Sequence, residues 1–388
     1  MKKLFLTICL SAIFICFCLC NFALTEETVL PEENPLIQMA ILLDTSGSMS
    51  GLIDQARAEL WSIVNEFIAA RKEGKAPEFQ VALYEYGKSS VPKETGYIRL
   101  IVPFTTDLDK ISEELFALTT NGGDEYCGWV IKDASESLEW SESPEDLKVI
   151  FIAGNEPFTQ GPIDYRQSCK TAISKGIVVN TIHCGSMEAG INGMWKDGSL
   201  LADGSYLNID HNREIFHVDA PQDVEIAELS QKLNDTYLPY GASGTSLKER
   251  QFEQDKNAAA ASPESTIQRA MSKSSLHYEN SSWDLVDAFE KEAINLEEIK
   301  VEDLPEKMVN MSVEERESYI RTKAKERSEI QQKIQTLNEQ RKKYVAEEMK
   351  KQQNKTDTLG SAITEIICKQ AEAKNFELNS PEQPIESN

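Results

Sequence analysis

Residues 39–49 read Met39-Ala40-Ile41-Leu42-Leu43-Asp44-Thr45-Ser46-Gly47-Ser48-Met49. The unbroken apolar run is typical of a strand buried on both faces of a parallel sheet. The polar bend that follows brings together one carboxylate and two hydroxyls, those of Asp44, Ser46 and Ser48, and Gly47 eases the turn of the backbone. Because ligands of parallel sheets bind outside the carboxyl ends of the strands, this bend is where we expect a site.

Short apolar runs alternate with amphipathic stretches on the carboxyl side of this bend, which predicts β-α-β units. We expect strands at 37–43, 79–84, 98–104, 147–153, 177–183 and 205–209, and helices at 52–72, 108–118, 128–140, 165–175 and 224–238. Apolar residues recur at helical spacing from Ile53 to Ile68, so one face of the first helix packs on the sheet. The sequence therefore predicts an α/β domain over residues 36–241, with a doubly wound, mostly parallel sheet.

The side chains of the bend are hard oxygen donors, which suit Mg²⁺ or Ca²⁺. The loop has neither the glycine pair nor the lysine of a phosphate cradle, and no G-x-S-x-G pattern surrounds either serine. A hydrolase would need a base, a nucleophile or a second metal cluster, none of which the sequence places here. A bound divalent cation is the expected chemistry, and a simple helix-capping turn is the alternative.

Asp44-x-Ser46-x-Ser48, placed after a buried strand and before a long amphipathic helix, resembles the metal-ion-dependent adhesion site (MIDAS) of von Willebrand factor type A (VWA) domains. The order of elements over residues 36–241 resembles the same family. The resemblance implies one divalent cation, Mg²⁺ or Ca²⁺, held by this loop and two others. It also implies an open coordination position that an Asp or Glu of a protein partner completes.

Two loops depart from the family's pattern. The second, residues 119–128, has Asp124 and Glu125 where the family has a threonine, so one of these acids is the expected ligand and Thr119 or Thr120 is the alternative. The third reads Ala153-Gly154-Asn155-Glu156-Pro157, where the family reads Thr-Asp-Gly. Gly154 thus stands at the position of the family's aspartate, and Asn155 is the oxygen donor expected to support the metal or to replace a ligand.

The amino-terminal residues predict export. Met1-Lys2-Lys3 precede an uncharged, mostly apolar run from Leu4 to Cys20, with small residues near Ala23, which is the order of a secretory signal peptide over residues 1–25. A retained anchor and lipid attachment at Cys20 are the alternatives, and only these would bring the protein to a membrane. We expect the protein in the periplasm, at the cell surface or outside the cell.

Four cysteines remain after the leader. In an oxidising compartment we expect a disulfide between Cys169 and Cys184, or one that uses Cys127, and buried free thiols are the alternative.

The carboxyl-terminal third is predicted as a linker at 242–276, a helical region at 277–376 and a disordered tail at 377–388. Residues 311–352 form one long charged helix in this prediction, begun by a capping box of Ser312 and Glu315. Ile330, Ile334, Leu337 and Tyr344 lie at heptad positions, which Arg341 and Glu348 interrupt. A coiled coil, a two-helix hairpin and weak self-association all remain open.

Charge limits the classes of partner. Lys+Arg 40 against Asp+Glu 64 gives a formal net charge of −24, which repels nucleic acid and anionic membranes. The sequence therefore predicts an exported, non-enzymatic module that binds a protein through its cation. The alternative is a metal-independent envelope scaffold that acts through the helical carboxyl-terminal arm.

Overall fold

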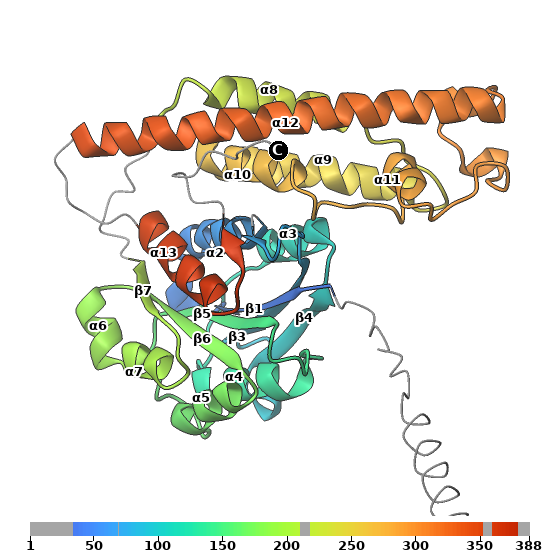
Figure 1. Cartoon of the computed structure of the whole chain (residues 1–388). Coiled ribbons are helices and arrows are strands. Elements are labelled where there is room, and N and C mark those ends of the chain that lie inside the picture. The colour runs from blue at the N-terminus through green and yellow to red at the C-terminus, as the bar shows by residue number, and fades with distance from the viewer. Residues whose placement is uncertain (1–33, 69, 210–217, 352–358, 379–388) are drawn as a thin grey trace, which may run out of the picture. The chain divides into compact units, whose positions relative to one another are not determined.

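A six-stranded sheet forms the centre of the fold, with the strand order β4-β3-β1-β5-β6-β7 in the computed structural model (Figure 1). The strands are β1 (Leu36–Asp44), β3 (Glu78–Tyr86), β4 (Ile98–Thr105), β5 (Leu147–Gly154), β6 (Ile177–Cys184) and β7 (Tyr206–Ile209). The β3–β4 pair is antiparallel and the other neighbours are parallel. The structure describes residues 34–68, 70–209, 218–351 and 359–378.

The direction of strand order reverses between β1 and β5. From β1 the chain adds β3 and then β4 on one side, and it adds β5, β6 and β7 on the other. The carboxyl ends of β1 and β5 therefore flank the crevice where such sheets bind ligands.

Helices cover both faces of the sheet (Figure 1). Helices α2 (Ile53–Ile68), α3 (Leu108–Ala117) and α13 (Leu359–Glu372) lie on one face, and α4 (Cys127–Ser137) and α5 (Tyr165–Ser174) lie on the other. Along β1, Met39 and Ile41 enter one core, and Ala40 and Leu42 enter the opposite one. Burial on both faces explains the unbroken apolar run of this strand, and the predicted α/β class is confirmed.

The first helix and the carboxyl-terminal tail differ from the sequence-based expectation in a related way. Helix α2 ends at Ile68 rather than Lys72, because the chain then forms the short strand β2 (Ala70–Arg71). Strand β8 (Glu377–Leu378), which we expected in the disordered tail, pairs with β2 in an antiparallel manner.

The segment predicted to be a linker is instead two packed helices, α9 (Gly244–Ala261) and α10 (Pro263–Lys273). The prediction failed because these helices bury polar side chains as well as apolar ones. Gln251 and Gln254 of α9 are buried, as are Arg269 and Lys273 of α10. Composition alone therefore gave no apolar stripe by which to recognise them.

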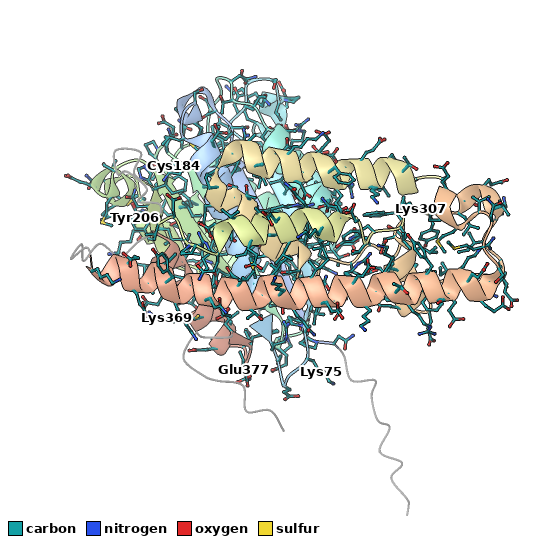
Figure 2. All side chains as sticks on the ribbon, turned by 90° about the horizontal axis from the view of Figure 1, so that it is seen from above. Lys75, Cys184, Tyr206, Lys307, Lys369 and Glu377 are labelled. Carbon is teal, nitrogen blue, oxygen red and sulfur yellow. The ribbon has the colours of Figure 1, made fainter. Side chains whose placement is uncertain are left out.

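Helix α12 (Val313–Lys351) packs along α8 (Asp223–Asn234), α10 and α11 (Leu285–Glu290), as Figure 2 shows from above. Its buried stripe runs at seven-residue spacing through Ile320, Arg327, Ile334 and Arg341. The stripe is covered by the protein's own chain, and the described residues from Pro35 onward form one compact unit. The predicted leader lies outside the described residues, and none of the helices within them has the length and apolarity needed to cross a membrane.

All four cysteines within the described residues are free, so the predicted disulfide between Cys169 and Cys184 is wrong. The sheet separates the two side chains, since Cys169 belongs to the core under α4 and α5 and Cys184 to the core on the opposite face. Cys127 shares the face of Cys169 and is also a buried free thiol.

A buried ionic network joins the sheet layer to the helices above it. Arg269 of α10 is 2% exposed, and its Nη1 lies 2.6 Å from Oδ1 of Asp109 on α3. Tyr278 Oη donates to the other oxygen of Asp109 over 2.6 Å, and Asp255 of α9 lies 2.8 Å from Arg269 Nε. The contact between the layers therefore includes buried charges, which are paired, beside the apolar residues of one continuous core.

Replacing Asp109 by alanine should destabilise the protein by about 3–5 kcal/mol, because it leaves a buried guanidinium short of one partner. Urea unfolding measures the loss. The control Glu113→Ala removes a half-exposed carboxylate of the same helix, paired with Lys110, and should cost no more than about 1 kcal/mol. Equal losses in the two variants would contradict a role for the network in holding the layers.

Candidate metal centre

The two strand ends at the reversal of strand order carry the central residues of the site. Asp44 is the last residue of β1, and Asn155 directly follows β5. The parallel register pairs Leu43 with Ala153, so the two side chains emerge at the same edge of the sheet. The β3 strand lies on the other side of β1 and ends at Tyr86, which pairs with Asp44.

The hydroxyls of the bend connect these strand ends. Ser46 Oγ lies 2.8 Å from Ser48 Oγ, and Ser48 Oγ donates to Asn155 Oδ1 over 2.9 Å. Since the only hydroxyl proton of Ser48 goes to Asn155, Ser46 is the donor in the first bond. Ser46 is buried and Ser48 is exposed, so the row of oxygens leads from the interior to the solvent.

Asp44 is fully buried and only partly satisfied. Its Oδ1 accepts a hydrogen bond of 2.7 Å from the backbone N–H of Ser46, and its Oδ2 is buried without a hydrogen-bond partner. Burial, reinforced by the nearby charge of Glu125, raises the pKa of Asp44 to about 7, although the Ser46 N–H opposes the shift. A buried carboxylate oxygen without a donor is costly, and a cation would compensate it.

Of the two acids in the second loop, Glu125 is the one that approaches this carboxylate. It is 5% exposed, and burial raises its pKa, while the nearby hydroxyl of Ser46 opposes the rise. The charges of Glu156 and Asp124 raise it further. Asp124 is half-buried and accepts a hydrogen bond of 3.1 Å from Tyr126 Oη.

The two threonines of this loop are engaged elsewhere. Thr119 is exposed and accepts a hydrogen bond of 3.1 Å from Lys88 Nζ, and Thr120 Oγ1 lies 2.9 Å from Ser50 Oγ. The structure thus brings Asp44, Ser46, Ser48, Glu125 and Asn155 together, and it does not bring Thr119, Thr120 or the carboxylate of Asp124 into the same group.

The close surroundings of Gly154 explain why this position of the third loop carries no aspartate. A Cβ at Gly154 would lie 2.5 Å from Tyr86 Oη, 3.0 Å from the Trp195 ring and 3.1 Å from Asp44 Cβ. Tyr86 Oη is fixed there by its hydrogen bond of 3.0 Å to the carbonyl of Ala153. The space that a carboxylate would need is therefore occupied by two buried rings.

Gly87 is a part of the site that the sequence analysis missed. It follows β3 with φ +81°, and a Cβ there would lie 2.8 Å from Asp44 Oδ1 and 3.0 Å from Glu125 Cγ. The only signal in the sequence is a glycine directly after a buried strand, which does not tell which side chains lie opposite.

The grouped side chains offer carboxylate, hydroxyl and amide oxygens, which are the donors that Mg²⁺ and Ca²⁺ prefer. Within the part of the chain that the structure describes, no three His, Cys, Asp or Glu side chains are grouped so that they could hold a metal. The fit of a cation therefore depends on the serine hydroxyls and Asn155 together with Asp44 and Glu125.

No family model matches the chain, and no curated protein does. Among solved structures, the conserved hypothetical protein BatB from Bacteroides thetaiotaomicron is 17% identical over 45% of this chain and 90% of its own, with a TM-score of 0.35. The SpRpn10 VWA domain is 16% identical, over 46% of this chain and 91% of its own length, with a TM-score of 0.36. The proximal thread matrix protein 1 (PTMP1) from the mussel byssus has a zinc-occupied MIDAS motif. It is 12% identical, over 46% of this chain and 43% of its own length, with a TM-score of 0.35. Each of these matches covers less than half of this chain, and the chain's own strand order defines its α/β class.

The raised pKa of Asp44 predicts a specific dependence of stability on pH. Because the folded value of about 7 exceeds the ordinary 3.8, ionisation of Asp44 opposes folding, fully above pH 7 and not at all below pH 4. In a chelator at pH 7.5, Asp44→Asn should therefore raise the free energy of unfolding by about 2–4 kcal/mol. Urea unfolding at pH 7.5 and 4.5 measures the gain, which should shrink at the lower pH; a gain independent of pH would contradict the explanation.

Proposed function

We propose that this chain is an exported, non-enzymatic module that binds a protein partner through a divalent cation held by Asp44, Ser46, Ser48 and Glu125. Asn155 supports this group through its bond to Ser48. The observation that carries the proposal is the buried Oδ2 of Asp44. This atom has no hydrogen-bond partner, and side-chain oxygens that could bind a metal lie near it.

Charge balance supports a doubly charged ion. Asp44 and Glu125 supply two negative charges, and hydroxyls and waters complete the shell of Mg²⁺ or Ca²⁺. The gain of Glu125 in the second loop offsets the lack of a carboxylate at Gly154 in the third. A cation would thus remove the cost of burying two carboxylates side by side.

The same charges would make partner binding conditional on the cation. Asp124 and Glu156 lie close enough to Glu125 to raise its pKa, so the group without a cation is strongly negative and repels an acidic partner. When bound, the cation offers a positive centre for a carboxylate oxygen of the partner. The exposure of Ser48 gives that oxygen access from solvent.

Titration with Mg²⁺, Ca²⁺ or Mn²⁺ tests the site. At a concentration one hundred times Kd, a ligand of the folded state stabilises it by about 2.7 kcal/mol, so the melting temperature of the wild type should rise by several degrees. Asp44→Asn should show no such rise. Asp146→Asn is the matched control, since Asp146 is a buried carboxylate at the amino end of β5 that accepts from Leu36 N and Ser141 Oγ. Melting curves without any cation response in the wild type would refute the site.

Capture from the native envelope fraction tests the partner. Immobilised wild type should retain a protein in Mg²⁺ or Ca²⁺ and release it in chelator, whereas Asp44→Asn should retain none in either buffer. Retention of the same protein by both variants, with and without chelator, would favour a metal-independent scaffold instead.

A further inference from the structure

The third loop of the proposed cation site is held from behind by two aromatic rings. His183 Nε2 lies 3.2 Å from the carbonyl oxygen of Asn155, and Trp195 Nε1 donates to the carbonyl of Glu156 over 2.8 Å. A carbonyl only accepts, so the proton of the neutral imidazole lies on Nε2. Two ring N–H groups therefore bind the carbonyls of consecutive residues.

The loop that these rings hold carries the contacts to the rest of the site. Asn155 Oδ1 accepts the hydrogen bond of Ser48, and the preceding residue lies against Asp44, since a Cβ at Gly154 would lie 3.1 Å from Asp44 Cβ. Any shift of Asn155 would consequently change the positions of Ser48 and the environment of Asp44.

The two rings have little freedom to move. His183 is 3% exposed and Trp195 is fully buried, and they meet edge to face with centroids 5.7 Å apart. A Cβ at Gly190 would lie 2.7 Å from His183 Cγ, so this glycine lets the chain of α6 (Met187–Asn192) close over the imidazole. Trp195 begins α7 (Trp195–Leu200) and also contacts Phe158, at a centroid distance of 4.8 Å.

We propose that His183 and Trp195 are positioning residues that fix the third loop and thereby set the affinity of the site for its cation. The proposal rests on the proposed function, because it concerns the same site. Supporting groups behind metal ligands commonly contribute 10–100-fold to metal affinity by holding the ligands in place. Neither ring belongs to the grouped oxygen donors, so each would act through the backbone of Asn155 or Glu156.

The test compares Kd for Mn²⁺, measured by electron paramagnetic resonance, with the free energy of unfolding in chelator. His183→Phe keeps a ring against Trp195 but removes the Nε2 donor, and Trp195→Phe removes the indole donor. Both should weaken Mn²⁺ binding by about 10-fold or more. His183→Gln places an amide N–H where Nε2 lies, and it should restore most of the affinity.

Trp140→Phe is the matched control. Its indole Nε1 also donates to a backbone carbonyl, that of Ala134, over 2.8 Å, but it lies outside the grouped site residues. Trp140→Phe should lose about 1 kcal/mol of stability with its hydrogen bond while keeping the wild-type Kd. Trp195→Phe should lose more, because Trp195 is fully buried and Trp140 is half-buried.

The outcomes separate this inference from the proposed function. A wild type that binds no Mn²⁺ overturns both. A wild type that binds Mn²⁺, with an unchanged Kd in His183→Phe and Trp195→Phe, overturns only the positioning role. Weaker binding in Trp140→Phe to the same extent as in Trp195→Phe would assign the effect to general stability and would also overturn it. If His183→Phe does not fold, the pair Trp195→Phe and Trp140→Phe decides.

Discussion

The structure around the sheet's crevice depends on one buried carboxylate, that of Asp44. Its position follows from the fold, since it is the last residue of a central strand with neighbours on both sides. Water does not reach it, and its own chain supplies a clear donor to only one of its oxygens. A charge in such a place destabilises the folded state unless a counter-ion is present. The cation of the proposed function would be such a counter-ion.

The space around Asp44 is shaped by two glycines whose backbone approaches it closely, as well as by the neighbouring oxygen donors. Gly87 and Gly154 lie against Asp44 where any side chain would collide with it or with Tyr86 and Trp195. The absence of a carboxylate at Gly154 is thus a consequence of packing two aromatic rings behind the third loop. Glu125, on the opposite loop, restores the negative charge. Two carboxylates, those of Asp44 and Glu125, thus lie near one another although the third loop offers none.

The sequence predicted the sheet well because its strands are apolar on both faces and separated by amphipathic helices. It also placed Asp44, Ser46 and Ser48 at the crevice, because they lie in one short loop that follows a strand whose end must reach it. It could not choose between Asp124 and Glu125, because neighbouring residues of a loop point in different directions and only the fold decides which one turns inward. His183 and Gly87 come from distant parts of the chain and belong to no local pattern, so the sequence alone gave no reason to join them to the site.

The packing of the long helix α12 could not be predicted fully from the sequence either. Arg341 looked like an interruption of an apolar seam, yet in the structure it is buried at the same seven-residue spacing as Ile334 and lies 2.6 Å from Asp223 and 2.5 Å from Glu264. Arg327 is likewise buried against Asp284, at 2.8 Å, and Asp287. A charged residue can therefore continue a seam when its partners come from elsewhere in the same chain. Since these pairs fix α12 to its own protein and cover its buried stripe, α12 offers little apolar surface to a second molecule. That favours the proposed partner site, the polar crevice at Asp44, which is open to solvent at Ser48.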